Sequence, residues 1–151
     1  MMTRIANYGA YQMNKKKNST SKRGNVMSLV SIRGAITVTN NSKEEILEAT
    51  QMMLEAIIEN NGIQIEHIIQ IHFSGTKDLD AIYPAVAARK LNITEASLMC
   101  FQEFYVVGSL EKCIRVDLLV EQEGLSRENV KHQYLREAKC LRPDLVKESG
   151  E

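Results

Sequence analysis

Four arginines with apolar or structural neighbours indicate what chemistry this sequence can do. They lie in short segments spread along the chain: Arg33 in SIRGA, Arg89 in AARKL, Arg115 in KCIRV and Arg142 in CLRPD. A guanidinium is always charged, and its planar fork binds carboxylates through paired hydrogen bonds that lysine does not reproduce well. Each arginine alone is explained more simply by solvation or a surface salt bridge. Together they favour a site for a small anion with two carboxylates or phosphates.

Other polar side chains could join such a site, but they do not form a nucleophilic centre. Glu103 lies in CFQEF, Tyr134 has a phenol that can donate to an anion, and Cys100 has apolar neighbours. The sequence contains no GxSxG, P-loop, GxGxxG or CxxC motif, and Glu103 has no evident second carboxylate as an acid–base partner. Arginines with one glutamate and one tyrosine suit a reaction that needs only positioning and stabilisation of charge.

The histidines and cysteines are too scattered for a metal site or a disulfide framework. They lie in separate segments of the chain: His67, His72, His132, Cys100, Cys113 and Cys140. Metal sites need clustered ligands, and an odd number of cysteines without close pairs does not predict a set of disulfides. We therefore expect no metal and no cofactor, and a reducing, cytoplasmic setting.

Length and composition indicate one globular domain. The chain has 151 residues, of which 44% are hydrophobic, enough for a sizeable core. No apolar run approaches the roughly 18 residues of a transmembrane helix. The N-terminus lacks the apolar segment of a secretory signal. These features predict a protein that is not inserted in a membrane.

Charge is distributed unevenly between the N-terminal segment and the rest of the chain. The formal net charge is zero, but residues 1–26 hold six basic side chains and no acidic one. The remainder is therefore net acidic, which argues against a nucleic-acid-binding body. Residues 1–26 are polar and aperiodic, and we expect them to be a disordered extension. They are interpreted as an upstream start or cloning remnant before Met27, with a transit peptide or a nucleic-acid-binding arm as alternatives.

Hydrophobic patterns predict the elements that must position the polar residues. Strands are expected over 28–38, 68–75, 96–104, 112–120 and 134–143, and helices over 43–61, from Pro84 to Leu91, and over 126–132. Ser42 and Glu45 form a capping box at the start of the long helix, and Gly62 ends it. The resulting order is β–α–β–α–β–β–α–β, an α+β plan with a mixed sheet.

The strand over 112–120 has two distinct faces. Alternation puts four apolar residues on one face, namely Ile114, Val116, Leu118 and Val120, while Cys113, Arg115, Asp117 and Leu119 share the other. An arginine in mid-strand faces either solvent or an anion. The strand pattern alone leaves both readings open.

At these residues the chain resembles a known family. The segments SIRGAITV, SKEEILEAT, TKDLDAIYPAVAAR, CFQE, LEKCIRV and YLREAKCLRPDL occur in the order and spacing of the monofunctional, AroH-class chorismate mutases. The resemblance covers residues 27–145, which implies a chorismate mutase domain there, preceded by the extension 1–26 and followed by a flexible tail over 146–151. It also implies a ferredoxin-like, chorismate-mutase-like fold with helices on one face of the sheet. The family forms trimers with a barrel-like core and active sites between subunits.

The resemblance implies the rearrangement of chorismate to prephenate, in phenylalanine and tyrosine biosynthesis, without covalent catalysis. Arg115 would face the ether oxygen and a carboxylate, Arg33 with Tyr134 would bind the enolpyruvyl carboxylate, and Glu103 would accept from the ring hydroxyl. The remaining site residues would be Cys100 near that hydroxyl, Tyr83, Ala85 and Leu98 in the apolar wall, and Arg89, Leu141 and Arg142 at the rim. The chain departs from the family by Tyr83 for Phe, Val86 for Lys and Met99 for Thr, and by one residue missing between Arg89 and Cys100.

Two other functions are compatible with the same residues. A non-catalytic trimeric module could hold a small carboxylate with Arg115, Arg33 and Tyr134, but Glu103 beside an anion pocket is costly unless it meets a hydroxyl or a developing cation. An RNA-binding protein could use the basic extension 1–26, and its binding would then depend strongly on salt.

Overall fold

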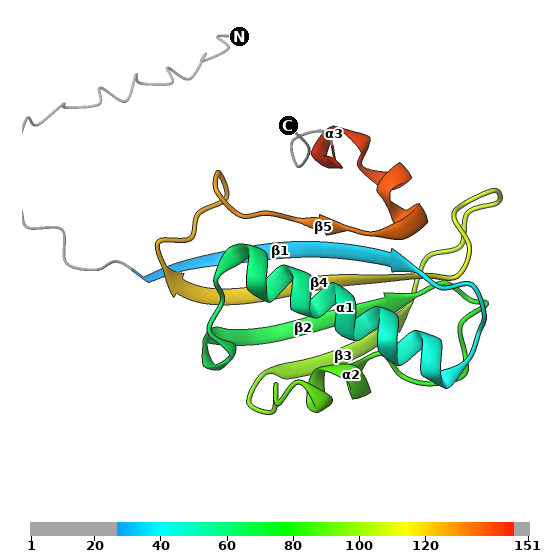
Figure 1. Ribbon diagram of the computed structural model, residues 1–151, viewed down its shortest axis with the longest axis horizontal. Coiled ribbons are helices and arrows are strands. Elements are labelled where there is room, and N and C mark those ends of the chain that lie inside the picture. Colours follow the sequence, from blue (N-terminus) through cyan, green and yellow to red (C-terminus); the bar gives the residue numbers. More distant parts are fainter. Residues whose placement is uncertain (1–26, 147–151) are drawn as a thin grey trace, which may run out of the picture.

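The computed structural model describes residues 27–146; our expectations for residues 1–26 and for the tail beyond residue 146 lie outside this part of the chain. Its centre is a five-stranded sheet with strand order β3-β2-β4-β1-β5 (Figure 1). The strands are β1 (Met27–Thr37), β2 (Ile68–Gly75), β3 (Ser97–Gln102), β4 (Cys113–Glu123) and β5 (Gln133–Tyr134). The pairs β1–β4 and β2–β4 are antiparallel, whereas β1–β5 and β2–β3 are parallel. The predicted α+β fold with a mixed sheet is confirmed.

The long helix α1 (Lys43–Asn61) begins and ends at the predicted residues. Ser42 is the N-cap, and its Oγ accepts from the Glu45 N–H at 3.2 Å. The Glu45 carboxylate does not return to Ser42 but accepts from the N–H groups of Thr39 at 3.0 Å and Asn40 at 2.9 Å. Gly62, with φ of 59°, is the left-handed C-cap, a conformation that glycine adopts without strain. The Glu45 side chain therefore stabilises the turn that follows β1.

One face of the sheet is covered by α1 and the short helix α2 (Ala85–Lys90) (Figure 1). Both helices contribute to a single apolar core with the strands, and its largest fully buried members include Ile46, Met53, Ile57, Phe73 and Leu118. Burial of each such side chain stabilises the fold by roughly 1.5–3 kcal/mol. The four apolar residues predicted to share one face of β4 are all buried in this core. The expectation of helices on one face is met by α1 and α2.

Gly34 permits the close contact between α1 and the sheet. A Cβ atom at this position would lie 2.9 Å from Ile57 Cδ1 and from Val116 Cγ1, and 3.0 Å from Met53 Cγ. Such distances are shorter than side chains tolerate. The glycine therefore interrupts the hydrophobic pattern of β1 without interrupting the strand.

The opposite face of the sheet carries neither α1 nor α2. It is covered at one end by the 3-10 helix η2 (Arg136–Leu141), where Ala35, Cys113 and Ala138 are buried together with partly buried Tyr134 and Leu141. Elsewhere this face exposes apolar side chains, among them Leu29, Met99 and Phe101, which are 59%, 50% and 48% exposed. We call this surface the open face.

Two predicted elements are wrong. Residues 134–143 are not a strand, because β5 ends at Tyr134 and is followed by η2 and by α3 (Pro143–Val146). Arg136 adopts φ of 52°, and its Nη1 donates to the Thr37 carbonyl at 3.0 Å, so the chain turns away from the sheet. Residues 126–132 form only a single turn. There the Asn129 side chain accepts from the Ser126 N–H at 2.7 Å, a local bond that competes with helix formation. A short 3-10 helix, η1 (Ile65–His67), was not predicted.

Candidate active site

One transverse row of residues crosses all five strands of the sheet. The register pairs Phe101 with Ser74, Ser74 with Arg115, Arg115 with Ala35, and Ala35 with Tyr134. Residues directly opposite each other project from the same face. Arg115 therefore lies in the central strand β4 and points to the open face, where its side chain is 38% exposed. Arg115 therefore has defined neighbours on this face, namely Ser74 on β2 and Ala35 on β1.

Glu103 is the carboxylate nearest to Arg115. Its Oε2 lies 3.3 Å from the Arg115 Nε and accepts a 2.6 Å hydrogen bond from the Ser74 hydroxyl. The Glu103 N–H donates to the Gly75 carbonyl at 2.8 Å, so the loop after β3 is tied to the end of β2. The structure thus brings together two of the three residues predicted to be catalytic.

The Nε of Arg115 is buried and has no hydrogen-bond acceptor among the described residues. The ion pair with Glu103 is close enough for attraction, but its geometry does not complete a hydrogen bond. A buried donor without an acceptor typically costs about 1–3 kcal/mol. A ligand atom that supplied the missing acceptor would offset this cost, so the donor is a candidate binding position.

Cys113 lies two residues before Arg115 on the same face and is fully buried. Burial raises the pKa of its thiol, and the nearby guanidinium of Arg115 opposes that rise only in part. A buried thiol with a raised pKa is a poor nucleophile. All three cysteines of the chain are free thiols, and Cys113 serves to pack η2 against the sheet.

Arg33 and His132 form a second polar group near the edge strand β5. Arg33 is opposite Asp117 in the β1–β4 ladder, and its backbone N–H donates to His132 Nδ1 at 3.0 Å. Partial burial lowers the pKa of His132, and the positive charges of Arg33 and Arg142 lower it further. At neutral pH the imidazole is therefore uncharged, with Nδ1 free to accept.

Arg142 completes this group from the C-terminal side. Its guanidinium makes a bidentate ion pair with Asp144, with Nε–Oδ1 and Nη2–Oδ2 distances of 2.9 Å and 2.7 Å. This pairing raises the pKa of Arg142, to which the nearby Tyr134 phenol also contributes. Leu141 packs with Tyr134 on the small core under η2. The structure thus gathers Arg33, Tyr134, Leu141 and Arg142 on the same side of the sheet as Arg115.

The other predicted site residues lie on the opposite, helix-covered side. Cys100 is opposite the fully buried Phe73 in the β2–β3 ladder, and both Cys100 and Leu98 pack against the main core. Ala85 is buried in that core at the start of α2, whereas Arg89 on α2 is exposed and Tyr83 is 73% exposed. Within one chain these five residues do not meet Arg115.

A cavity of about 570 Å³ lies beside two of these residues. Its lining includes Tyr83 and Cys100 together with Lys43, Lys77 and Phe101. The cavity is bounded by the loop after β2 and by β3. Its wall is largely apolar, and its charged members are Lys43, Lys77 and Asp80.

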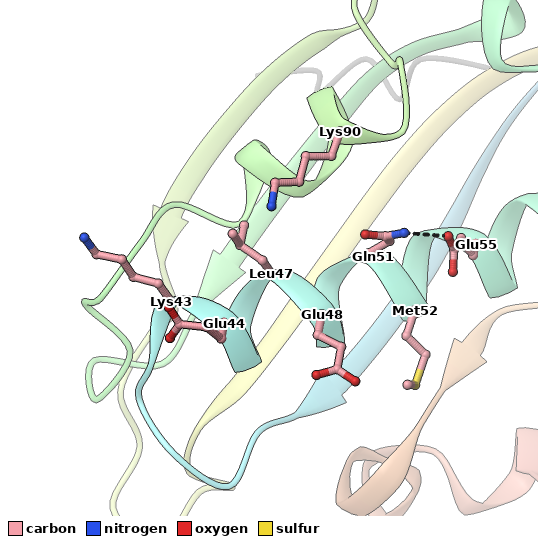
Figure 2. Close-up of a pocket in the computed structure, with 8 residues that line it drawn as sticks. All are labelled: Lys43, Glu44, Leu47, Glu48, Gln51, Met52, Glu55 and Lys90. Carbon is pink, nitrogen blue, oxygen red and sulfur yellow. Dashed lines mark hydrogen bonds between the residues drawn. The ribbon is translucent and has the colours of Figure 1, made fainter.

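A second hollow, between α1 and α2, has none of the predicted site residues (Figure 2). Its volume is about 480 Å³, and its wall combines both charge signs on exposed helix surface: Lys43, Glu44, Leu47, Glu48, Gln51, Met52, Glu55 and Lys90. The Gln51 side-chain amide donates a hydrogen bond to the Glu55 carboxylate at 2.8 Å (Figure 2). We interpret this hollow as solvated helix surface.

Sequence reasoning missed three residues that hold the charged groups in place. Ser74 bonds Glu103, His132 accepts from the Arg33 backbone, and Asp144 pairs with Arg142. Ser74 alternates with buried Phe73 in the predicted strand, so its outward face was readable from the pattern. That Ser74 lies beside Arg115 could not be predicted without the strand register, which pairs the two residues. Within residues 27–146 no three His, Cys, Asp or Glu side chains come together as a metal site.

Comparison with known proteins points to one family. Residues 29–145 match the family Chorismate mutase type I. The chorismate mutase AroH of Bacillus subtilis (strain 168) is 42% identical over 120 residues, which is 79% of this chain and 94% of that protein. The chorismate mutase AroH of Thermus thermophilus is 43% identical over 115 residues, or 76% and 93% of the two chains. A solved chorismate mutase from Clostridium thermocellum is 46% identical, with a TM-score of 0.70, over 74% of this chain and 98% of that one.

Proposed function

Since the chain belongs to the type I chorismate mutase family, and so converts chorismate to prephenate, we propose that Arg115 and Glu103 carry this reaction. The conversion is an intramolecular rearrangement in aromatic amino acid biosynthesis. One carbon–oxygen bond of the ether breaks while one carbon–carbon bond forms, and no atom is exchanged with the enzyme. Catalysis therefore rests on holding a compact substrate conformer and stabilising separated charge.

The single observation that carries this proposal is the buried Nε donor of Arg115, which lies beside Glu103 but has no hydrogen-bond acceptor among the described residues. In the transition state the ether oxygen gains negative charge and the ring becomes relatively positive. A cation and a carboxylate fixed 3.3 Å apart match that separation of charge. Arg115 faces the ether oxygen, and Glu103 accepts from the ring hydroxyl and faces the positive ring.

Arg33 and Tyr134 bind the enolpyruvyl carboxylate in this scheme. Support comes from their position on the same side of the sheet as Arg115 and from the His132 bond that fixes the Arg33 backbone. Leu141 and Arg142 lie at the rim on this side. Arg142 is held by Asp144 in the free protein, so it acts as a clamp that exchanges one carboxylate for another.

The site is completed by a second subunit in a homotrimer. Two observations support this step. Cys100, Leu98 and Ala85 lie on the helix-covered side, opposite to Arg115, so one small ligand cannot touch both groups within one chain. The open face also exposes Leu29, Met99 and Phe101, which need a cover. In the trimer the sheets surround a barrel-like core, and Tyr83, Ala85, Arg89, Leu98 and Cys100 of the neighbouring subunit close the cleft.

We assign the catalytic domain to residues 27–145, with 1–26 as an extension and 146–151 as a tail. A cytoplasmic location is supported by the free state of all three cysteines. No helix among residues 27–146 is long and apolar enough to cross a membrane. The small molecule chorismate and the neighbouring subunits are the partners, without nucleic acid.

The decisive experiment follows the loss of chorismate absorbance with wild type and with Arg115→Ala in parallel. Saturable loss with prephenate formed, and a nearly inactive but folded variant, is the expected result. A variant that keeps most of its turnover would contradict the role of Arg115. Light scattering on the same samples gives the oligomeric state, and a monomer that turns over normally would contradict the shared site.

A further inference from the structure

Lys77 occupies a position between the two groups of site residues. It lines the 570 Å³ cavity with Tyr83 and Cys100, and it also lines a smaller cavity of about 50 Å³ with Glu103 and Tyr105. Of the residues around the larger cavity, only Thr76 and Lys77 also border the smaller one. Lys77 was not among the site residues predicted from the sequence.

The backbone on either side of Lys77 is tightly held. The Thr76 N–H donates to the Cys113 carbonyl at 3.0 Å, and the Thr76 hydroxyl accepts from the Cys113 N–H at 3.0 Å. On the other side, the Asp78 carboxylate accepts from the Lys112 N–H at 2.8 Å. Both neighbours of Lys77 are thus attached to the start of β4, the strand that carries Arg115. The backbone of Lys77 is therefore fixed beside the site, while its exposed side chain can still rotate.

The charge of Lys77 is held but not neutralised. Its Nζ lies 3.4 Å from the centre of the Tyr105 ring. Among residues 27–146 the ion pairs are Arg115–Glu103 and Arg142–Asp144, and neither involves Lys77. An aromatic ring attracts an ammonium without cancelling its charge, whereas a carboxylate would do so. Lys77 therefore lies at the edge of both cavities without an ion-pair partner among residues 27–146, although Asp78, Glu103 and Glu111 also line the smaller cavity.

We propose that Lys77 is a substrate-binding residue, which takes the second carboxylate of the dianionic substrate. This inference rests on the proposed function, in which Arg115 and Arg33 account for the ether oxygen and the enolpyruvyl carboxylate. The ring carboxylate then still needs a cation. Lys77 lines the small cavity beside Glu103 of its own subunit, on the side of the cleft that carries Arg115, and its ammonium can move from the exposed Tyr105 ring to the ligand by side-chain rotation.

Lys43 provides a matched control because it is the other cation of the larger cavity. It does not border the smaller cavity with Glu103, and it also lines the helix hollow on the far side (Figure 2). It is exposed, like Lys77. Removing the charge of Lys43 changes the net charge by the same amount as removing that of Lys77, so only a local contact distinguishes the two variants.

The test measures kcat and KM for chorismate with Lys77→Gln, Lys77→Arg and Lys43→Gln. We expect Lys77→Gln to raise KM about tenfold with kcat changed little, since a charge-assisted bond to a carboxylate is lost. Lys77→Arg should restore most of the affinity, and Lys43→Gln should leave KM near the wild-type value. The salt dependence of KM should also weaken in Lys77→Gln alone, which a merely structural role would not produce.

Equal KM values for Lys77→Gln and wild type would overturn the inference, as would equal rises for Lys77→Gln and Lys43→Gln. Arg115→Ala, assayed in parallel, separates this failure from a failure of the proposed function. If Arg115→Ala is nearly inactive while Lys77→Gln is normal, only the role of Lys77 is wrong. If Arg115→Ala keeps its turnover, the site itself is misassigned and the Lys77 inference fails with it.

Discussion

The Nε atom of Arg115 lies 3.3 Å from Oε2 of Glu103, and the same oxygen accepts the Ser74 hydroxyl at 2.6 Å. Three strands or strand ends thus meet at one carboxylate oxygen: Arg115 from β4, Ser74 from β2, and Glu103 just after β3. Because strands of one sheet cannot shift independently, the distance between the two charges is set by the sheet. A site of this kind is organised before substrate arrives.

Replacing Arg115 by a neutral isostere should lower kcat by about 10²–10³, the usual cost of one preorganised charge-stabilising donor. Citrulline keeps the shape of the side chain, so thermal unfolding should change little. Steady-state turnover of chorismate is the measurement. Arg127→Ala removes an exposed arginine from the turn after β4 and should retain wild-type kcat; a fully active citrulline protein would refute the charge argument.

Glu103→Gln should lower kcat by at least about tenfold, since the amide cannot complement positive charge on the ring. The amide oxygen can still accept from Ser74, so the variant should fold normally. The matched control is Glu111→Gln, which changes an exposed acid that lines the same small cavity. Similar kcat values for both variants would show that the carboxylate of Glu103 is not needed.

Arg142→Ala should raise KM and leave kcat nearly unchanged, because a rim cation supplies binding without acting on the reacting bonds. The companion variant Asp144→Asn should lower KM, since it removes the bidentate partner that holds Arg142 in the free protein. Initial rates over a range of chorismate concentrations separate the two constants. A large fall in kcat for Arg142→Ala would place this residue at the reacting atoms instead of the rim.

His132 should make the protein less stable in mild acid. Burial, with Arg33 and Arg142 nearby, lowers the pKa of His132 in the folded state, below the ordinary value of about 6.5. The unfolded chain therefore binds a proton first as pH falls, and stability is lost from about pH 6.5 down to the folded-state pKa. Protonated Nδ1 also cannot accept from the Arg33 N–H.

Thermal unfolding of wild type and His132→Gln, at about pH 8 and about pH 5.5, tests this effect. The variant should be less stable at the higher pH but should lose less stability on acidification. Parallel loss in the two proteins would mean that another group is responsible for the acid sensitivity.

Gly34→Ala should destabilise the fold by about 1–3 kcal/mol, the range for an overpacked core. The added methyl group would lie 2.9 Å from Ile57 Cδ1 and from Val116 Cγ1. Gly75→Ala is the control, because its nearest neighbour, Leu79 Cβ, would be 4.0 Å away. Denaturant unfolding compares the two, and an equal cost would show that α1 yields to the extra atom.

Local signals predicted much of the fold. Ser42, Glu45 and Gly62 delimit α1, and the alternation of β4 separates buried residues from the row that includes Arg115. These predictions succeeded because capping and periodicity depend on neighbours in sequence. The strand predicted over 134–143 failed because its direction is decided by distant partners. Arg136 bonds the Thr37 carbonyl, and Leu135 bonds the Ala35 carbonyl at 2.9 Å.

The site was predictable only in its parts. Residue types and the family resemblance predicted Arg115, Glu103 and Arg33 as site residues, but not that Ser74 bonds Glu103 or that His132 supports Arg33. These bonds connect residues 29 and 99 positions apart in the chain, a distance over which local patterns carry no information. The division of the site residues between the two sides of the sheet likewise follows from the strand register, which places Cys100 in line with Phe73 and Val116 and therefore on the face opposite Arg115.

Because β4 is the central strand, the segment around Arg115 should open to solvent less readily than the segment around Arg142. β4 is hydrogen-bonded on both sides, to β2 and to β1, whereas Arg142 lies between two short helical segments after a two-residue edge strand. Backbone amides of a central strand exchange with solvent mainly through global unfolding, and those of peripheral segments through small local openings. Amide hydrogen exchange should therefore be slowest around Arg115 and fast around Arg142. Under the proposed assignment, substrate would enter by opening the segment around Arg142 while Arg115 stays in place.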